Sequence, residues 1–214
     1  MRFEAVIFDL DGVICHTDKY HYEAWKQIAD GLGVHFDELA NNRLRGVGRM
    51  ESLDIILEGY PAALSEEEKK ELAEFKNARY VELLHQMTPG SVSADVRSTL
   101  RALKAKGLRL AIGSSSKNAR LILEKTGLTN WFDAISDGNN ITEPKPNPEV
   151  FLCAAQLVGA EPSACLVVED AESGVAAARR AGMRCAAIGD AIKCGAADYN
   201  LTFFPELLVL SEIA

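Results

Sequence analysis

The chain has 214 residues, of which 48% are hydrophobic and 25% are charged, and its formal net charge at pH 7 is −8. This length and apolar content predict one large globular domain, or a domain with a smaller insert. The acidic balance argues against nucleic acid and anionic membranes as partners, because both bind basic surfaces.

Short apolar runs alternate with helical patterns along most of the chain. Runs that are apolar throughout and alternate with helices predict a parallel sheet with helices on both faces. The predicted strands are 4–8, 108–112, 132–135, 165–168 and 184–188, and the predicted helices between them are 94–106, 117–126, 148–158 and 172–181. Each of these helices is followed directly by glycine, a common helix terminator. Beyond Gly189 the pattern predicts only an edge strand near 200–203 and a short helix from Pro205.

The stretch from about residue 18 to residue 86 breaks this alternation and shows no strand pattern. It predicts helices at 19–31, about 50–59 and 66–86, and Ser65 with Glu68 forms a capping box for the last one. We therefore expect an all-helical domain at 16–90, inserted into an α/β core made of 1–15 and 91–214.

The cysteines and the N-terminus bear on location. The five cysteines are odd in number and form no C-x-x-C pair, which favours neither a disulfide framework nor a zinc site. The N-terminus reads as a strand with acids rather than as a signal peptide. No apolar run approaches the ~20 residues of a transmembrane helix. We expect a cytoplasmic monomer without a membrane partner.

Polar residues follow four of the predicted strands. The carboxyl ends of parallel strands meet at one edge of the sheet, where functional residues gather. Each residue also has an ordinary explanation, such as an Asp-Gly turn, a serine helix cap, a solvated loop lysine or acids beside a helix dipole. Their order along one α/β chain favours a single site. The residues are Asp9, Asp11, Ser114, Lys145, Glu169 and Asp170.

These residue types suit phosphoryl transfer. Carboxylate oxygens and substrate phosphate oxygens are ligands that Mg²⁺ prefers. Asp9 can attack phosphorus, and Asp11 can donate and accept the proton of the leaving or attacking oxygen. Lys145 would offset repulsion between carboxylate and phosphate. Ser114 and the backbone N–H groups after it could hold phosphoryl oxygens.

The four motifs resemble those of the haloacid dehalogenase superfamily of phosphotransferases, over essentially the whole chain. The resemblance implies a Rossmann-like core with an inserted helical cap. It also implies a phosphoenzyme at Asp9 and Mg²⁺ as cofactor. By this resemblance the metal ligands are Asp9, Asp11, Glu169 and Asp170, and the catalytic residues are Asp9, Asp11, His21, Ser114 and Lys145.

Within the superfamily, the segments "LRGVGR", "SSSKNA" and "PKPNPEVF" are similar to the β-phosphoglucomutase subfamily. This similarity implies interconversion of β-glucose 1-phosphate and glucose 6-phosphate through β-glucose 1,6-bisphosphate, so hexose phosphates and bisphosphates are the expected substrates. Arg49 is the expected clamp for the phosphate that is not transferred. Trp25 is placed either beside the sugar or in a helix core. The substrate-binding residues implied are Trp25, Arg45, Gly46, Val47, Arg49, Lys76, Asn77, Ser115, Ser116, Lys117 and Asn118.

Several alternatives stay open at this point. Water as the phosphoryl acceptor would make the chain a magnesium-dependent sugar-phosphate phosphatase. A phospho-receiver signalling domain would need no helical insert, so the insert argues against it. A carbon–halogen hydrolase would need no carboxylates for Mg²⁺, so Asp11 and Asp170 argue against that class. The chain departs from the subfamily at Cys15-His16, where Thr or Ser and then Asp are common, at Arg45, where Lys is usual, and at Gly48, where Ser is common. The departures at Arg45 and Gly48 leave the sugar preference open, whereas the one at Cys15-His16 lies in the expected hinge of the cap.

Overall fold

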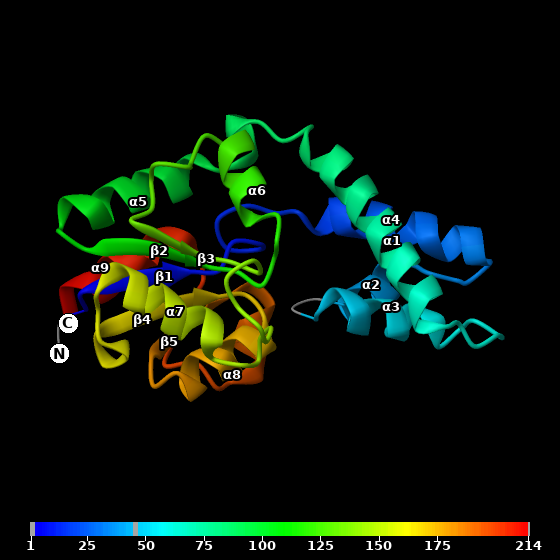
Figure 1. The fold of residues 1–214 in the computed structure, drawn as a ribbon. Coiled ribbons are helices and arrows are strands. Elements are labelled where there is room, and N and C mark those ends of the chain that lie inside the picture. The colour runs from blue at the N-terminus through cyan, green and yellow to red at the C-terminus, as the bar shows by residue number, and fades with distance from the viewer. Residues whose placement is uncertain (1–2, 45–46, 214) are drawn as a thin grey trace. The chain divides into compact units, whose positions relative to one another are not determined.

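The computed structural model describes residues 3–44 and 47–213, with the side chains of 211–213 left aside (Figure 1). The chain divides into two compact units, one made of Met1–His16 with Met87–Ala214 and the other of Thr17–Gln86. Their boundaries lie one and four residues from the expected 16–90 insert. The segment around Pro89 stays with the first unit because Arg97 Nη2 donates hydrogen bonds to the Pro89 and Thr126 carbonyls, at 2.8 and 2.7 Å.

The first unit contains a six-stranded sheet whose strand pairs are all parallel, which confirms the predicted fold class. The strand order is β3-β2-β1-β4-β5-β6. Phe8 at the end of β1 pairs in register with Ile112 of β2 and Val168 of β4, so these strands end at one level. The strands are β1 Ala5–Phe8, β2 Arg109–Gly113, β3 Ala134–Ser136, β4 Cys165–Glu169, β5 Arg184–Ile188 and β6 Tyr199–Leu201.

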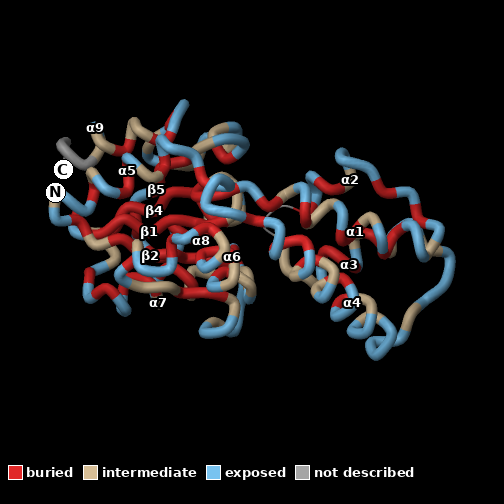
Figure 2. Tube along the Cα trace, turned by 90° about the horizontal axis from the view of Figure 1, so that it is seen from above, coloured by how far each residue is buried: buried red, intermediate tan, exposed pale blue. Residues whose placement is uncertain are grey.

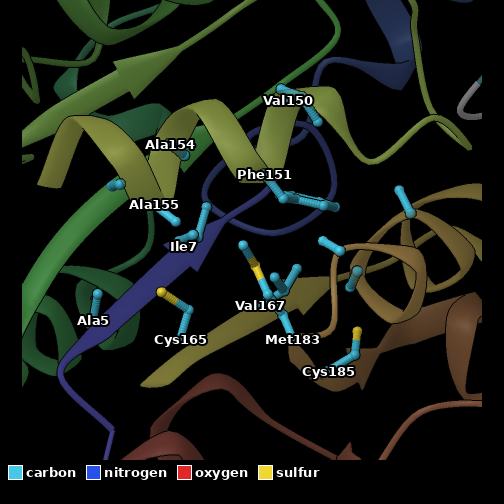
Figure 3. Close-up of a cluster of buried hydrophobic side chains, with 14 of the residues drawn as sticks. Ala5, Ile7, Val150, Phe151, Ala154, Ala155, Cys165, Val167, Met183 and Cys185 are labelled. Carbon is cyan, nitrogen blue, oxygen red and sulfur yellow. The ribbon is translucent and has the colours of Figure 1, made fainter. Parts of the chain in front are cut away.

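One face of this sheet is covered by α7 (Glu149–Val158) and α8 (Glu172–Arg180) (Figure 1). Alternate strand residues point to this face, as expected for a period of two. Figure 3 shows Ile7 of β1 and Val167 of β4 together with Phe151 of α7 in the buried cluster beneath these helices. Side-chain burial on this scale is the main stabilising contribution to the unit.

The opposite face is covered by α5 (Ala94–Ala105), α6 (Ala119–Lys125) and the C-terminal segment with α9 (Leu207–Ile213). The ring of Phe8 lies 6.2 Å from that of Phe132 and 5.8 Å from that of Phe204, between centroids. Since both faces are covered, the central strands β1 and β4 are buried along their whole length (Figure 2), whereas the edge strands β3 and β6 are only partly buried. The 3₁₀ helices of this unit are Pro89–Ser91, Pro162–Ala164, Gly189–Cys194 and Phe204–Glu206.

The second unit contains only helices in its described residues. Its apolar core brings Trp25 and Ile28 of α1 together with Leu53 of α3. The Ser65–Glu68 capping box is present, as predicted. The helix α2 was not predicted; it has five residues and begins where the Asp37 carboxylate accepts from Ala40 N at 2.8 Å. The helices are α1 Asp18–Leu32, α2 Glu38–Asn42, α3 Arg49–Leu57 and α4 Glu66–Leu84.

Within residues 3–44 and 47–213, no helix combines the length and the apolarity that are needed to cross a bilayer.

Candidate active site

Three buried charged side chains meet at the carboxyl edge of the sheet. Asp9 follows β1, Glu169 ends β4, and Lys145 comes from the loop before α7. The Lys145 ammonium donates hydrogen bonds to Asp9 Oδ1 and Glu169 Oε1. Its Nζ also lies 4.7 Å from the centroid of the Phe151 ring. Residues from three distant parts of the sequence thus form one ion-paired cluster.

The charges in this cluster do not balance. Burial raises the pKa of Asp9, and Glu169 and Asp170 raise it further, while Lys145 acts in the opposite direction. Burial alone would lower the pKa of Lys145, but Asp9 and Glu169 more than offset this, so the ammonium stays charged. One cation therefore faces three carboxyl groups, an arrangement that favours a second cation.

The three carboxyl groups fit a hard divalent cation. Asp9, Glu169 and Asp170 each offer an oxygen, and these oxygens lie within 4.8 Å of one another. Gly12 has a φ of +84°, and a Cβ there would lie 1.9 Å from Asp170 Oδ2, so glycine leaves the room that this carboxylate occupies. An all-oxygen donor set is what Mg²⁺ prefers. The residues present thus fit the expected cofactor.

Asp11 was also expected to bind the metal, but its carboxylate is not part of this group of three. It is half-buried, two residues after Asp9, and forms an isolated parallel bridge with Cys15. In the same turn, Gly12 N donates to the Cys15 carbonyl at 2.7 Å. This turn fixes the backbone that carries Asp11 at the strand end.

Ser114 begins a tight turn between β2 and α6. Its backbone N–H donates to Ser136 O at 3.0 Å, and its hydroxyl accepts from Ser116 N at 3.2 Å. The Ser116 hydroxyl accepts in turn from Asn118 N at 3.2 Å. Ser115 Oγ accepts from the backbone N–H of Lys145 at 3.3 Å, which ties the turn to the lysine loop. The sequence prediction that this loop and Lys145 share a site is consistent with this contact.

A second group of functional candidates lies within the helical unit. Lys76 of α4 is 3% exposed, and its Nζ lies 2.9 Å from His21 Nδ1. The same nitrogen lies 4.7 Å from the ring centroids of both Trp25 and Tyr80. The His21 and Tyr80 rings lie 4.1 Å apart between centroids, with their planes tilted by 34°. We call His21, Trp25, Lys76 and Tyr80 the lysine–aromatic cluster.

Arg49 lies at the start of α3 in the same unit. Its Nη2 donates to Asn77 Oδ1 at 2.8 Å, and partial burial lowers the pKa of the guanidinium. Burial, followed by the charges of Lys76 and Arg49, lowers the pKa of His21. Cations thus gather where His21 stays neutral. Of the predicted substrate loop, Val47 is half-buried, whereas Arg45 and Gly46 lie outside the described residues.

Two aromatic members of these sites were given no role from the sequence. Tyr80 lies four residues after Lys76 on α4, a spacing of about one helical turn that would have placed both on one face. Phe151 lies on the buried face of α7 beneath Lys145. Trp25 is 2% exposed and packs in the core of the helical unit, one of its two expected placements, while its ring faces Lys76.

A parallel sheet covered on both faces, with an aspartate-centred cluster at its carboxyl edge, is typical of α/β enzymes whose active sites lie at the strand ends. The chain belongs to the haloacid dehalogenase-like hydrolase family, which matches residues 3–182. This membership confirms the superfamily predicted from the four motifs.

Proteins with named activities are similar to this chain. A β-phosphoglucomutase of Bacillus subtilis is 39% identical over 188 residues, covering 87% of this chain and 83% of that protein. A phosphorylated carbohydrates phosphatase of Thermotoga maritima is 34% identical over 183 residues, covering 84% and 82%. The crystal structure of a β-phosphoglucomutase from Clostridium difficile matches with a TM-score of 0.89 at 37% identity, covering 96% of this chain and 93% of that chain.

Proposed function

We propose that the chain is a β-phosphoglucomutase that interconverts β-glucose 1-phosphate and glucose 6-phosphate. The observation that carries this proposal is the similarity to proteins of that name in both sequence and structure. The Asp9–Lys145–Glu169 cluster supports phosphoryl transfer, and the cations Arg49 and Lys76 of the helical unit support binding of a phosphorylated sugar.

In the proposed reaction Asp9 already carries a phosphoryl group, supplied by the bisphosphate primer. The 6-hydroxyl of β-glucose 1-phosphate attacks this phosphorus, Asp11 takes the hydroxyl proton, and the P–O bond to Asp9 breaks, which gives β-glucose 1,6-bisphosphate. The bisphosphate then binds in the opposite orientation, and an Asp9 oxygen attacks the phosphorus of the 1-phosphate. The P–O bond to the sugar breaks, Asp11 returns its proton to the departing oxygen, and glucose 6-phosphate leaves the phosphorylated enzyme.

Charge compensation is the main task of the core residues. The Lys145 ammonium already contacts the Asp9 carboxylate, which must approach a phosphate dianion. Asp9, Glu169 and Asp170 would hold Mg²⁺, which when bound supplies positive charge against the phosphate and the carboxylates. Ser114 and the N–H groups of the following turn would bind phosphoryl oxygens.

The helical unit would bind the part of the substrate that is not transferred, and we propose it as the cap domain. Arg49 offers a guanidinium for bidentate binding of the second phosphate. Lys76 would meet hydroxyl oxygens of the sugar, and the buried rings of Trp25 and Tyr80 hold its ammonium in place. Ser116, Lys117 and Asn118 would add donors from the core.

A magnesium-dependent sugar-phosphate phosphatase is the second candidate. The similarity to a phosphorylated carbohydrates phosphatase favours it, since that protein matches over 84% of this chain. The chemistry at Asp9 would be the same, with water as acceptor in place of a sugar hydroxyl. The two functions differ in product rather than in the core site.

An anomer-resolved NMR assay tests the proposal. The purified protein is supplied with Mg²⁺, a trace of glucose 1,6-bisphosphate and either the β- or the α-anomer of glucose 1-phosphate. We expect glucose 6-phosphate from the β-anomer only, with the Asp9→Asn protein as inactive control. Orthophosphate and free glucose as main products would assign the phosphatase instead.

A further inference from the structure

Lys145 is buried, yet it is carried by a loop without helix or strand between Ser136 of β3 and Glu149 of α7. Its neighbours Pro144 and Pro146 are exposed. Apolar packing therefore does not fix the backbone on either side of it, and the loop must be held by hydrogen bonds. The question is which side chain outside the cluster holds it.

One carboxylate oxygen accepts three hydrogen bonds from the part of this loop that precedes Lys145. Glu149 Oε2 accepts from Thr142 N at 2.9 Å, from Thr142 Oγ1 at 2.9 Å and from Glu143 N at 2.8 Å. These bonds, that from Glu143 N first, lower the pKa of Glu149, so the carboxylate is ionised at neutral pH. Charge-assisted bonds of this kind are about twice as strong as neutral ones.

The downstream part of the loop is held from the next helix. Arg180 Nη1 of α8 donates to the Pro146 carbonyl at 2.9 Å. Asn147 Oδ1 accepts from Glu149 N at 3.0 Å, which joins the loop to the start of α7. Glu149 and Arg180 thus hold the chain by hydrogen bonds on the two sides of Lys145. Ser115 Oγ accepts a hydrogen bond from the backbone N–H of Lys145 itself.

We propose that Glu149 is a positioning residue that sets the Lys145 ammonium against Asp9 and Glu169. This rests on the proposed role of Lys145 in phosphoryl transfer. Glu149 itself holds the loop backbone at Thr142 and Glu143, so its proposed effect on catalysis is indirect and passes through Lys145. The carboxylate acts as a fixed anchor on a rigid helix, an efficient way to orient a charged group for catalysis.

The test uses magnesium-dependent hydrolysis of p-nitrophenyl phosphate, which needs Asp9 and Lys145 but no sugar. We expect Glu149→Ala to lower kcat by about 10–100-fold, the usual effect of removing a group that orients a reacting one, with a smaller change in KM. Glu149→Gln keeps an acceptor and should recover part of the loss. The matched control is Glu161→Gln, an exposed carboxylate at the opposite end of β4, which should keep wild-type kcat.

A double-mutant cycle separates positioning from general damage. On a Lys145→Met background, Glu149→Ala should cost less than about 2-fold, because the residue through which it acts is gone. Equal losses on both backgrounds, or wild-type kcat in Glu149→Ala, would overturn the proposal. If the wild-type protein hydrolyses p-nitrophenyl phosphate but makes no glucose 6-phosphate, the proposed mutase function fails. The double-mutant cycle still tests the role of Glu149, because it uses only the hydrolysis reaction.

Crystal structures of the variants give a readout that needs no activity. In Glu149→Ala we expect the 142–146 backbone to shift and the Lys145 contacts to Asp9 and Glu169 to be lost, with the sheet unchanged. In Glu161→Gln both contacts should remain. Retention of both Lys145 contacts in Glu149→Ala would overturn the proposal even in a protein that shows no turnover.

Discussion

Lys76 Nζ lies 2.9 Å from His21 Nδ1 inside the helical unit. An ammonium can only donate, so we assign Nδ1 as the acceptor and place the imidazole proton on Nε2. Burial and the nearby cations Lys76 and Arg49 lower the pKa of His21, which agrees with a neutral ring. The pair thus keeps one cation rather than two in a place proposed to receive an anionic sugar.

This pair predicts a pH dependence of stability. Because the pKa of His21 is lower in the folded than in the unfolded chain, the unfolded chain binds the proton first as the pH falls. The free energy of unfolding is therefore highest above the unfolded value of about 6.5 and decreases below it, by at most about 1.4 kcal/mol per pH unit for this group. Urea unfolding of His21→Gln from about pH 7.5 to about pH 5 should show a flatter decrease than wild type.

The matched control is His35→Gln, which removes an exposed histidine and leaves His21 in place. This variant should keep the decrease in the free energy of unfolding that His21 causes below about pH 6.5. An unchanged slope in His21→Gln would show that the ring is not held neutral by the Lys76 contact. Nitrogen chemical shifts of His21 would report the Nε2–H tautomer directly.

Lys145→Met should destabilise the α/β unit strongly. It leaves the buried carboxylates of Asp9 and Glu169 without their shared cation. Breaking a buried ion pair in this way costs about 3–5 kcal/mol. Since burial already raises the pKa of Asp9, protonation relieves the cost, so the deficit should shrink as the pH is lowered from neutral. Thermal unfolding with and without Mg²⁺ measures both effects, and added Mg²⁺ should restore part of the stability.

Lys104→Met is the control for this variant. Its ammonium lies 3.7 Å from Asp133 in an exposed pair, and such pairs contribute at most about 1 kcal/mol. Equal losses from both lysines would mean that the Lys145 cluster is not a charge-compensated site.

The sequence allowed the sheet and the strand-end residues to be predicted for a clear physical reason. Strands covered on both faces are apolar throughout, so polar residues such as Asp9 and Ser114 mark where strands end. Parallel pairing then brings those ends together, and the register of Phe8 with Ile112 and Val168 agrees with this. The family itself followed from the order of the motifs and was confirmed by comparison.

Other features depend on contacts that leave little trace in a single sequence. The helix α2 has five residues, too few for a periodic pattern. The 3₁₀ helix Gly189–Cys194 has six residues, too few for a periodic pattern although Ala191 is buried, and was expected as irregular chain. Phe151 reads as an ordinary core residue of α7, and only the fold places its ring beneath Lys145. The roles assigned to individual site residues stay predictions until variants are measured.

Gly12→Ala should weaken magnesium binding. A Cβ at this position would lie 1.9 Å from Asp170 Oδ2, and the φ of +84° is unfavourable for alanine. The carboxylate must therefore move, and a displaced ligand or supporting group typically costs about 10–100-fold in metal affinity. Titrating Mg²⁺ against ester hydrolysis and by calorimetry measures the change.

Gly31→Ala is the matched substitution. Nothing lies within 4 Å of a Cβ there, and the residue is inside helix α1. Alanine should stabilise this helix by about 0.5–1 kcal/mol and leave magnesium affinity unchanged. Wild-type magnesium affinity in Gly12→Ala would contradict the assignment of Asp170 as a ligand.

Arg49→Ala should separate phosphoryl transfer to sugar from transfer to water. The guanidinium is oriented by Asn77 at 2.8 Å and is proposed to hold the phosphate that is not transferred. A hydrogen bond to a charged group contributes about 1.5–3 kcal/mol, so mutase turnover should fall by about 10–100-fold. Hydrolysis of p-nitrophenyl phosphate, which has no second phosphate, should stay within about 3-fold of wild type, since Arg49 adds no binding energy to this substrate.

Arg79→Ala, which removes an arginine paired with Glu82 on α4, should leave both rates unchanged. A parallel fall of both rates in Arg49→Ala would show that Arg49 supports the phosphorylated aspartate or the fold, and not the second phosphate.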